Sequence, residues 1–150
     1  MIKTVLDPNG NKHKIEIDKD LEWLAPYLSE AKKAGIPVWR LDRIVGYFVP
    51  EGKVEVQHAA TWKDGHSKAA ITLLKKRQTL IGNNDGTIRP NGYTEADKGA
   101  NFEFTLNSFA HELAHLVIWE HSVERFIVES KLMVRFARLA KRRGYKGYDG

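Results

Sequence analysis

Two histidines and a glutamate form the pattern His-Glu-Leu-Ala-His over residues 111–115. On a helix, side chains four residues apart share one face with Cβ atoms about 5–6 Å apart, so His111 and His115 could present two imidazoles to one metal ion. Glu112 is their neighbour around that helix, where its carboxylate could act as general base toward a water molecule at an open coordination position. This spacing predicts a zinc-dependent hydrolase, and more specifically a peptidase.

A third metal ligand has to come from outside this helical turn. His121 follows His115 by six residues, and on an unbroken helix it would lie about 240° around the axis from His115. We therefore expect the helix to end between Leu116 and His121, which would allow three histidines to meet. Glu124 and Glu129 are the alternative third ligands, because zincins of the glutamate type take this ligand from a following helix.

The turn between the histidines differs from that of the metzincins. The six-residue step from His115 to His121 equals the metzincin spacing, but Ile118 stands where that signature has a glycine. A β-branched residue resists the left-handed backbone conformation that a glycine turn uses. Ile118 therefore argues against a metzincin turn.

The residues around the motif resemble another family, the SprT-like zinc metallopeptidases with their compact bacterial and phage relatives. The similarity lies in His-Glu-Leu-Ala-His-Leu at 111–116, then His121-Ser122 and Phe126, within a stretch from about Phe104 to Leu139. It implies three zinc ligands, His111, His115 and His121, with Glu112 as the base and a protein or peptide as the substrate. It also implies that the strand near Ala69–Leu73 borders the cleft, where an extended peptide could pair with its edge.

Composition limits the possible metal ligands and the expected cellular location. The chain of 150 residues has the length of one domain, which we expect to cover residues 1–150, and it contains no cysteine. Disulfides, cysteine-ligated zinc and iron–sulfur clusters are therefore excluded, and a Zn²⁺ site must use His, Asp or Glu. The sequence lacks a secretory signal pattern and an apolar run of about 20 residues, so we expect a soluble cytoplasmic protein with no membrane contact.

The hydrophobic pattern predicts an α+β, zincin-like domain: a small twisted, mostly antiparallel sheet, a central motif helix, and N- and C-terminal helices. Turn residues at 7–11 predict a hairpin over 3–17, and a helix should follow Asp18 or Asp20, or begin near Ala25 with Pro26 in its first turn, and stop at Gly35. Further expected elements are strands within 38–49, 53–57 and 69–74, a motif helix over 106–119 capped by Thr105, and a last helix capped by Ser122.

Residues 81–99 are rich in Gly, Asn and Asp, and we expect a long loop that could form a wall of the substrate cleft. The loop lacks the twelve-position spacing of an EF-hand, which argues against calcium. Tyrosine hydroxyls could stabilise an oxyanion, and the candidates are Tyr93, Tyr145 and Tyr148. Ordinary surface or packing roles are expected for His13, His58, His66, Trp62 and Trp119, with His66 the nearest of the three histidines to the cleft.

The last helix is strongly basic, in a chain of net charge +5. Its Lys and Arg residues predict a solvated face, or alternatively an electrostatic attachment to DNA with stacking on the tail tyrosines. A different function class also fits the motif, a non-enzymatic DNA- or protein-binding module in which the metal ion only staples the fold. The sequence specifies neither the identity of the substrate nor an oligomeric state.

Overall fold

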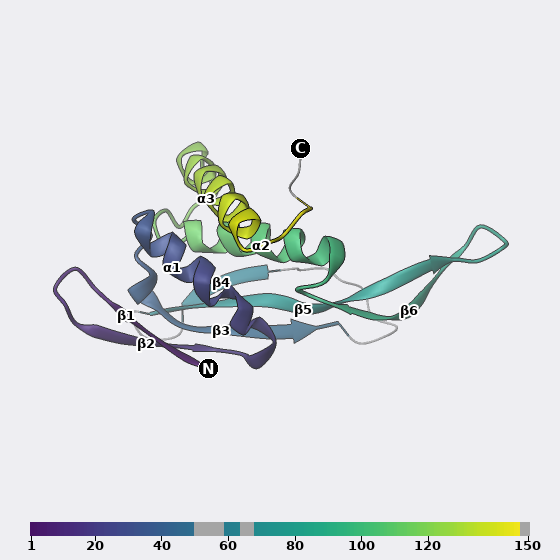
Figure 1. The fold of residues 1–150 in the computed structure, drawn as a ribbon, viewed down its shortest axis with the longest axis horizontal. Coiled ribbons are helices and arrows are strands. Elements are labelled where there is room, and N and C mark those ends of the chain that lie inside the picture. The colour runs from purple at the N-terminus through teal and green to yellow at the C-terminus, as the bar shows by residue number, and fades with distance from the viewer. Residues whose placement is uncertain (50–58, 64–67, 148–150) are drawn as a thin grey trace.

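The structure is a computed structural model that describes residues 1–49, 59–63 and 68–147 (Figure 1). Its strands are β1 (Ile2–Leu6), β2 (Lys12–Ile17), β3 (Leu41–Phe48), β4 (Ala59–Lys63), β5 (Ala69–Gly82) and β6 (Ile88–Glu95). Its helices are α1 (Ala25–Lys33), α2 (Gly99–Ala114) and α3 (Val123–Arg142), with short 3₁₀ helices at Lys19–Leu24 and Val38–Arg40. The expected strand over 53–57 lies outside the described residues.

The strands form one mixed sheet in the order β1-β2-β3-β5-β4, and β6 pairs with the second half of β5. The outer pairs β1–β2, β4–β5 and β5–β6 are antiparallel, but β3 runs parallel to both β2 and β5. The expectation of a mostly antiparallel sheet is therefore wrong for its two central strand pairs, β2–β3 and β3–β5, which are parallel. Parallel neighbours need a crossover connection, and α1 supplies it between β2 and β3.

All three helices cover one face of the sheet (Figure 1). α2 packs on β4 and β5, and α3 packs on α2 and α1. Large buried side chains fill the space between these layers, including Ile44 and Ile71 from the sheet, Phe109 from α2 and Phe136 from α3. The rings of Phe109 and Phe136 stack with centroids 6.1 Å apart. The C-terminal half of α2 is thus held between the sheet and α3.

Local signals for turns and helix ends are confirmed in three places. β1 and β2 form the expected hairpin, and Pro26 stands in the first turn of α1. α1 ends as expected at Gly35, whose φ of +91° favours glycine, while Ile36 N–H donates to Ala31 O at 3.0 Å. Ser122 caps α3 by accepting a hydrogen bond from Arg125 N–H at 3.2 Å.

Two expected elements need correction. The motif helix begins at Gly99 rather than Leu106, and Thr105 is buried within it instead of capping it. The expected loop over 81–99 is largely the strand β6, which pairs with an extension of β5 as a hairpin beyond the rest of the sheet (Figure 1). This hairpin leads into the first turn of α2, whereas the motif lies at the last turn. The hairpin therefore does not form a wall of the site, contrary to expectation.

Candidate metal centre

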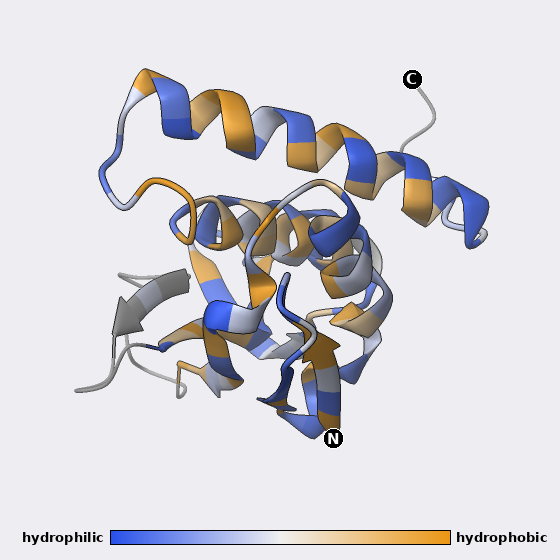
Figure 2. Ribbon diagram, turned by 90° about the vertical axis from the view of Figure 1, so that its left-hand side faces the viewer, coloured by the Kyte–Doolittle hydropathy of each residue, from blue (hydrophilic) through white to orange (hydrophobic). Residues whose placement is uncertain are grey.

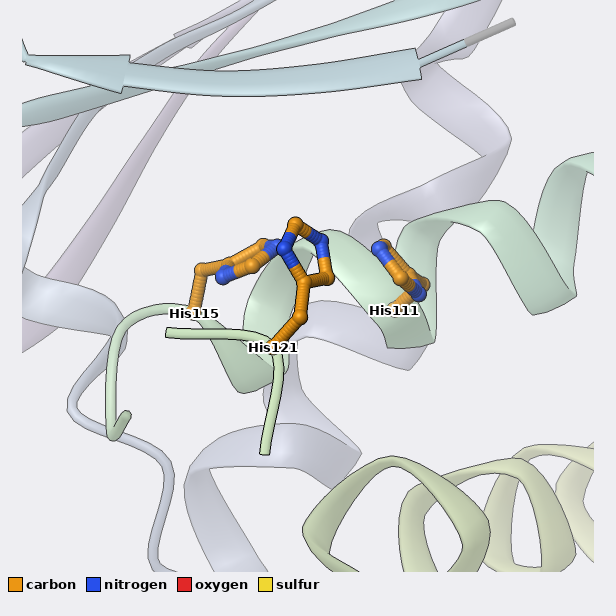
Figure 3. A group of neighbouring side chains, drawn as sticks. All are labelled: His111, His115 and His121. Carbon is orange, nitrogen blue, oxygen red and sulfur yellow. The ribbon is translucent and has the colours of Figure 1, made fainter. Parts of the chain in front are cut away.

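Three histidine side chains meet where α2 ends. His111 lies on the last turn of α2, His115 is the residue directly after that helix, and His121 approaches them from the connector to α3, with the three rings turned toward one another (Figure 3). The ring centroids are 5.2 Å apart for His111–His115, 5.5 Å for His111–His121 and 4.7 Å for His115–His121. One nitrogen from each ring lies within 4.8 Å of the others, and among the described residues only these three side chains form such a group.

The connector turns His121 back because α2 tightens and stops early. His115 N–H bonds to Glu112 O at 3.1 Å, and Leu116 N–H bonds to Leu113 O at 3.0 Å, so the last bonds span three residues instead of four. No non-glycine residue in the described ranges has a positive φ, so Ile118 makes its part of the turn without the left-handed conformation. The chain leaves the helix before His121, as expected, but α2 already ends at Ala114 rather than between Leu116 and His121, so the expected extent to residue 119 is wrong.

Two hydrogen bonds hold this turn in place. Arg40 Nη1 donates to Leu116 O at 3.1 Å and satisfies a carbonyl that the helix end leaves without a partner. His115 Nδ1 lies 2.8 Å from Trp119 O, which ties the C-cap residue of α2 to the connector. The position of His121 is therefore set by contacts on both sides of the turn.

The environment of His115 favours the neutral imidazole. Its side chain is almost completely buried, and this burial lowers the pKa of His115, although the bond to Trp119 O and the charge of Glu112 act in the opposite direction. Because a carbonyl oxygen only accepts, Nδ1 carries the proton in the 2.8 Å contact with Trp119 O. Nε2 is then left with a lone pair, the form that binds a metal ion.

His111 is oriented by a carboxylate from α3. Glu129 Oε1 lies 2.6 Å from His111 Nδ1, so this nitrogen donates and Nε2 keeps its lone pair. Arg125 Nη1 lies 2.8 Å from the same carboxylate oxygen and 3.4 Å from His111 Nδ1. Arg125 is only 5% exposed, and its buried charge is balanced by Glu129.

Glu112 lies beside the triad and is 4% exposed. Its Oε1 is 4.0 Å from His111 Nε2. The Thr61 hydroxyl, which comes from β4, lies 2.5 Å from Oε2 and 3.1 Å from the main-chain oxygen of Glu112. One carboxylate oxygen thus faces a triad nitrogen while the other receives a hydrogen bond from the sheet.

The donor set could hold a metal ion. It consists of three imidazole nitrogens in a chain without cysteine, and imidazole is a common ligand of divalent transition metals. His111 and His115 have in addition the outer hydrogen bonds that fix the ring orientation of metal-bound histidines.

The two competing glutamates lie elsewhere. Glu129 contacts Nδ1 of His111, and Glu124 is exposed on the first turn of α3. Neither joins the group of neighbouring ligand atoms. Glu129 is instead the acceptor that holds His111.

Other residues singled out by sequence lie away from the triad or outside the described residues. Tyr93 donates its hydroxyl to Val49 O next to the end of β3, and Tyr145 stacks on Phe102 in the first turn of α2. His13 pairs with Asp7 in the first hairpin. His58, His66, Tyr148 and the side chain of Trp62 lie outside the described residues. Trp119 is half-exposed, with its ring centroid 5.9 Å from that of His115.

The expected role of Ala69–Leu73 as the edge of a cleft is wrong. This segment of β5 pairs with β3 on one side and β4 on the other, so its backbone groups are already used. Among the described strands β4 stands at this end of the sheet, and it supplies Thr61.

Sequence reasoning missed Thr61, Arg40 and Arg125. Thr61 and Arg40 are 51 and 76 residues away from their partners, and no local pattern marks either contact. The Arg125–Glu129 pair has the i,i+4 spacing of a helical ion pair, which was a readable signal, but only the packing of α3 on α2 brings it to His111.

Comparisons with protein-family models, curated proteins and solved structures found no match for this chain. No helix in the described part of the chain is both long enough and apolar enough to cross a membrane.

Proposed function

We propose that this chain is a zinc-dependent metallopeptidase of the SprT-like kind, with His111, His115 and His121 as zinc ligands and Glu112 as general base. The observation that carries the proposal is the meeting of three histidine nitrogens within 4.8 Å beside a buried glutamate. A site with three protein ligands leaves one coordination position for water or substrate, which is the arrangement of catalytic rather than structural zinc.

The zinc ion would lower the pKa of a water molecule and polarise the scissile carbonyl. Glu112 would accept the proton as that water attacks the peptide carbonyl and would then pass it to the leaving amine. Thr61 favours this role because its hydroxyl bonds to Oε2 and leaves Oε1 toward the triad. Glu129 and the Trp119 carbonyl keep the protons of His111 and His115 on their outer nitrogens.

An extended substrate would bind along β4. Sheet edges bind peptides by main-chain hydrogen bonds, and of the described strands β4 is the one at the end of the sheet beside α2. Because Thr61 of β4 bonds to Glu112, a peptide paired with this strand would pass close to the proposed base.

The test combines metal analysis with one conservative substitution. The purified chain should hold one zinc ion, and Glu112→Gln should retain that zinc while hydrolysis of an unfolded protein substrate falls by about 10²–10⁴-fold. Glu16→Gln, a change of the same kind at an exposed position of β2, is the matched control and should keep full activity. An unchanged rate in Glu112→Gln would refute the proposal.

The rival function, a binding module with a structural metal, makes the opposite predictions. Removal of the metal by a chelator should then unfold the domain, and Glu112→Gln should leave partner binding intact. The hydrophobic core that α1, α2, α3 and the sheet form in the described residues extends well beyond the triad. Folding therefore does not depend on the metal ion alone, which supports a catalytic rather than a structural role for the ion.

A further inference from the structure

Exposed apolar side chains flank His121 on both sides. Val117 and Trp119 precede it in the connector, and Val123, Phe126 and Ile127 follow it at the start of α3. Val123 is 71% exposed and Phe126 58% exposed, although burial of such apolar side chains is favourable. We call these five residues the apolar patch.

Beyond the apolar patch, exposed apolar side chains continue along the outer face of α3. Val123 and Ile127 lie four residues apart and Val134 follows seven later, so all three share one side of the helix. The opposite side is the one that carries Arg125, Leu132 and Phe136 into the interior. Figure 2 shows apolar colour on the connector and at the beginning of α3. α3 therefore has a second apolar face that the domain does not cover.

This patch is continuous with the triad. The Trp119 ring lies 5.9 Å from the His115 ring, and its carbonyl accepts the hydrogen bond that fixes that histidine. Phe126 N–H bonds to the carbonyl of Ser122, the residue after His121, at 3.0 Å. A molecule bound at the histidines would therefore have apolar side chains within about one helical turn on either side of His121.

The charges within the patch are acidic. Glu120 and Glu124 are exposed between its apolar members, whereas the chain as a whole has a net charge of +5. Carboxylates at these positions attract a basic side chain and repel an acidic one. Two copies of the chain paired through this surface would bring the same glutamates together, which disfavours a symmetric dimer.

From this juxtaposition we propose that the apolar patch is a substrate subsite, one that accepts a bulky apolar side chain with a basic rather than an acidic neighbour. The inference rests on the proposed peptidase function and gives it a substrate class. Such side chains are accessible in unfolded or loosely folded polypeptides and buried in folded ones. The patch thus selects unfolded segments.

The experiment measures binding apart from hydrolysis. Zinc-loaded Glu112→Gln protein is titrated into three fluorescent twelve-residue peptides that differ only at the centre, which reads Phe-Lys, Ser-Lys or Phe-Glu. Phe-Lys should bind about tenfold more tightly than Ser-Lys, as expected for burial of an aromatic ring. Phe-Lys should also bind more tightly than Phe-Glu, by a margin that shrinks as salt is added.

Matched variants locate the subsite. In the Glu112→Gln background, Phe126→Ser should remove the preference for Phe over Ser. Val134→Ser should retain it, because Val134 is also exposed on α3 but lies eight residues, or about 12 Å, further along the helix. Equal effects of the two substitutions, or no preference in the parent protein, would overturn the proposal. A dimer that Phe126→Ser dissociates would assign the patch to a second copy and overturn it as well.

The outcome separates this inference from the proposed function. Selective peptide binding without any hydrolysis by the unsubstituted chain would support the subsite and contradict the peptidase. Zinc-dependent hydrolysis with no preference among the three peptides would leave the peptidase intact and refute the subsite.

Discussion

Glu129 Oε1 on α3 lies 2.6 Å from Nδ1 of His111 on α2. A carboxylate that accepts a hydrogen bond from one ring nitrogen holds the proton of its histidine there, fixes the ring and strengthens the other nitrogen as a ligand. Arg125 bonds to the same carboxylate oxygen and supplies a buried positive charge that keeps Glu129 in place. Glu129, which sequence reasoning weighed as a metal ligand, thus contacts a histidine of the triad instead.

Substitution of Glu129 tests this relationship. Glu129→Gln should weaken zinc binding by about 10–100-fold, the usual effect of losing an outer-shell partner, with three imidazoles still bound. Zinc affinity is measured by competition with a chromophoric chelator, and the visible spectrum of the cobalt form reports the ligand set. Glu124→Gln, on the exposed side of the same helix, is the control and should leave both unchanged. A cobalt spectrum that loses a ligand in Glu129→Gln would make Glu129 a direct ligand.

Removal of His121 should have a larger effect than removal of Glu129. His121→Ala takes away one of three nitrogens, so we expect zinc affinity to fall by more than about 100-fold. The fold should persist, because His121 is exposed and lies in the connector rather than in the core. His13→Ala removes a histidine from the distant hairpin and serves as the comparison. Zinc retained by His121→Ala after dialysis against a weak chelator would exclude His121 as a ligand.

The sequence predicted those parts of the site that depend on local geometry. The i,i+4 spacing of His111 and His115 and the cap at Ser122 are helix properties, and both were readable. A turn near Ile118 was predicted because His121 cannot face His115 on a continuous helix. What completes the site comes from distant chain segments, through Thr61 on β4 and Arg40 before β3.

The errors in the predicted fold have the same origin. β6 contains Pro90 and Gly92 and is largely exposed, so it has no alternating pattern, and its pairing with the long strand β5 makes it a strand. α2 starts early because Phe102 stacks on Trp23 and Tyr145, contacts that span the whole chain. Tertiary packing overrides local propensity at both places.

The first hairpin should depend on pH through Asp7. Hydrogen bonding to His13 lowers the pKa of Asp7 from 3.8 to about 2, with further bonds from the backbone of Asn11 and Asn9. The folded state thus favours the carboxylate, and its contribution to stability is complete above pH 4 and is lost as the pH falls toward 2. Asp7→Asn should therefore lower the free energy of unfolding at pH 5 and have less effect at pH 2.5.

Urea denaturation at the two pH values measures this difference. His13→Ala removes the first-ranked cause of the shift, so Asp7→Asn should cost less in that background than in the unsubstituted chain. An effect of Asp7→Asn that is the same at pH 5 and pH 2.5 would contradict the assignment.

The last helix carries a basic stripe that predicts binding to DNA. Lys131, Arg135, Arg138 and Arg142 follow the spacing i, i+4, i+7 and i+11, which places them on one side of α3. Arg135 is paired with Glu30 at 3.1 Å, while the other three are exposed. Each phosphate contact contributes about 0.9 to the slope of log affinity against log salt concentration. Three contacts would give a slope near 2.7.

Joint substitution of Lys131, Arg138 and Arg142 by Gln should therefore weaken binding of a short DNA duplex and reduce this slope by up to about 3. The control replaces Lys12, Lys14 and Lys19, which are equally exposed but lie in or near the first hairpin, and removes the same total charge. If bulk charge alone attracts DNA, both triple variants should lose affinity alike. If the stripe is the contact surface, only the α3 variant should change the slope. Absence of binding at low salt would exclude DNA as a partner of α3, because electrostatic attraction is strongest there.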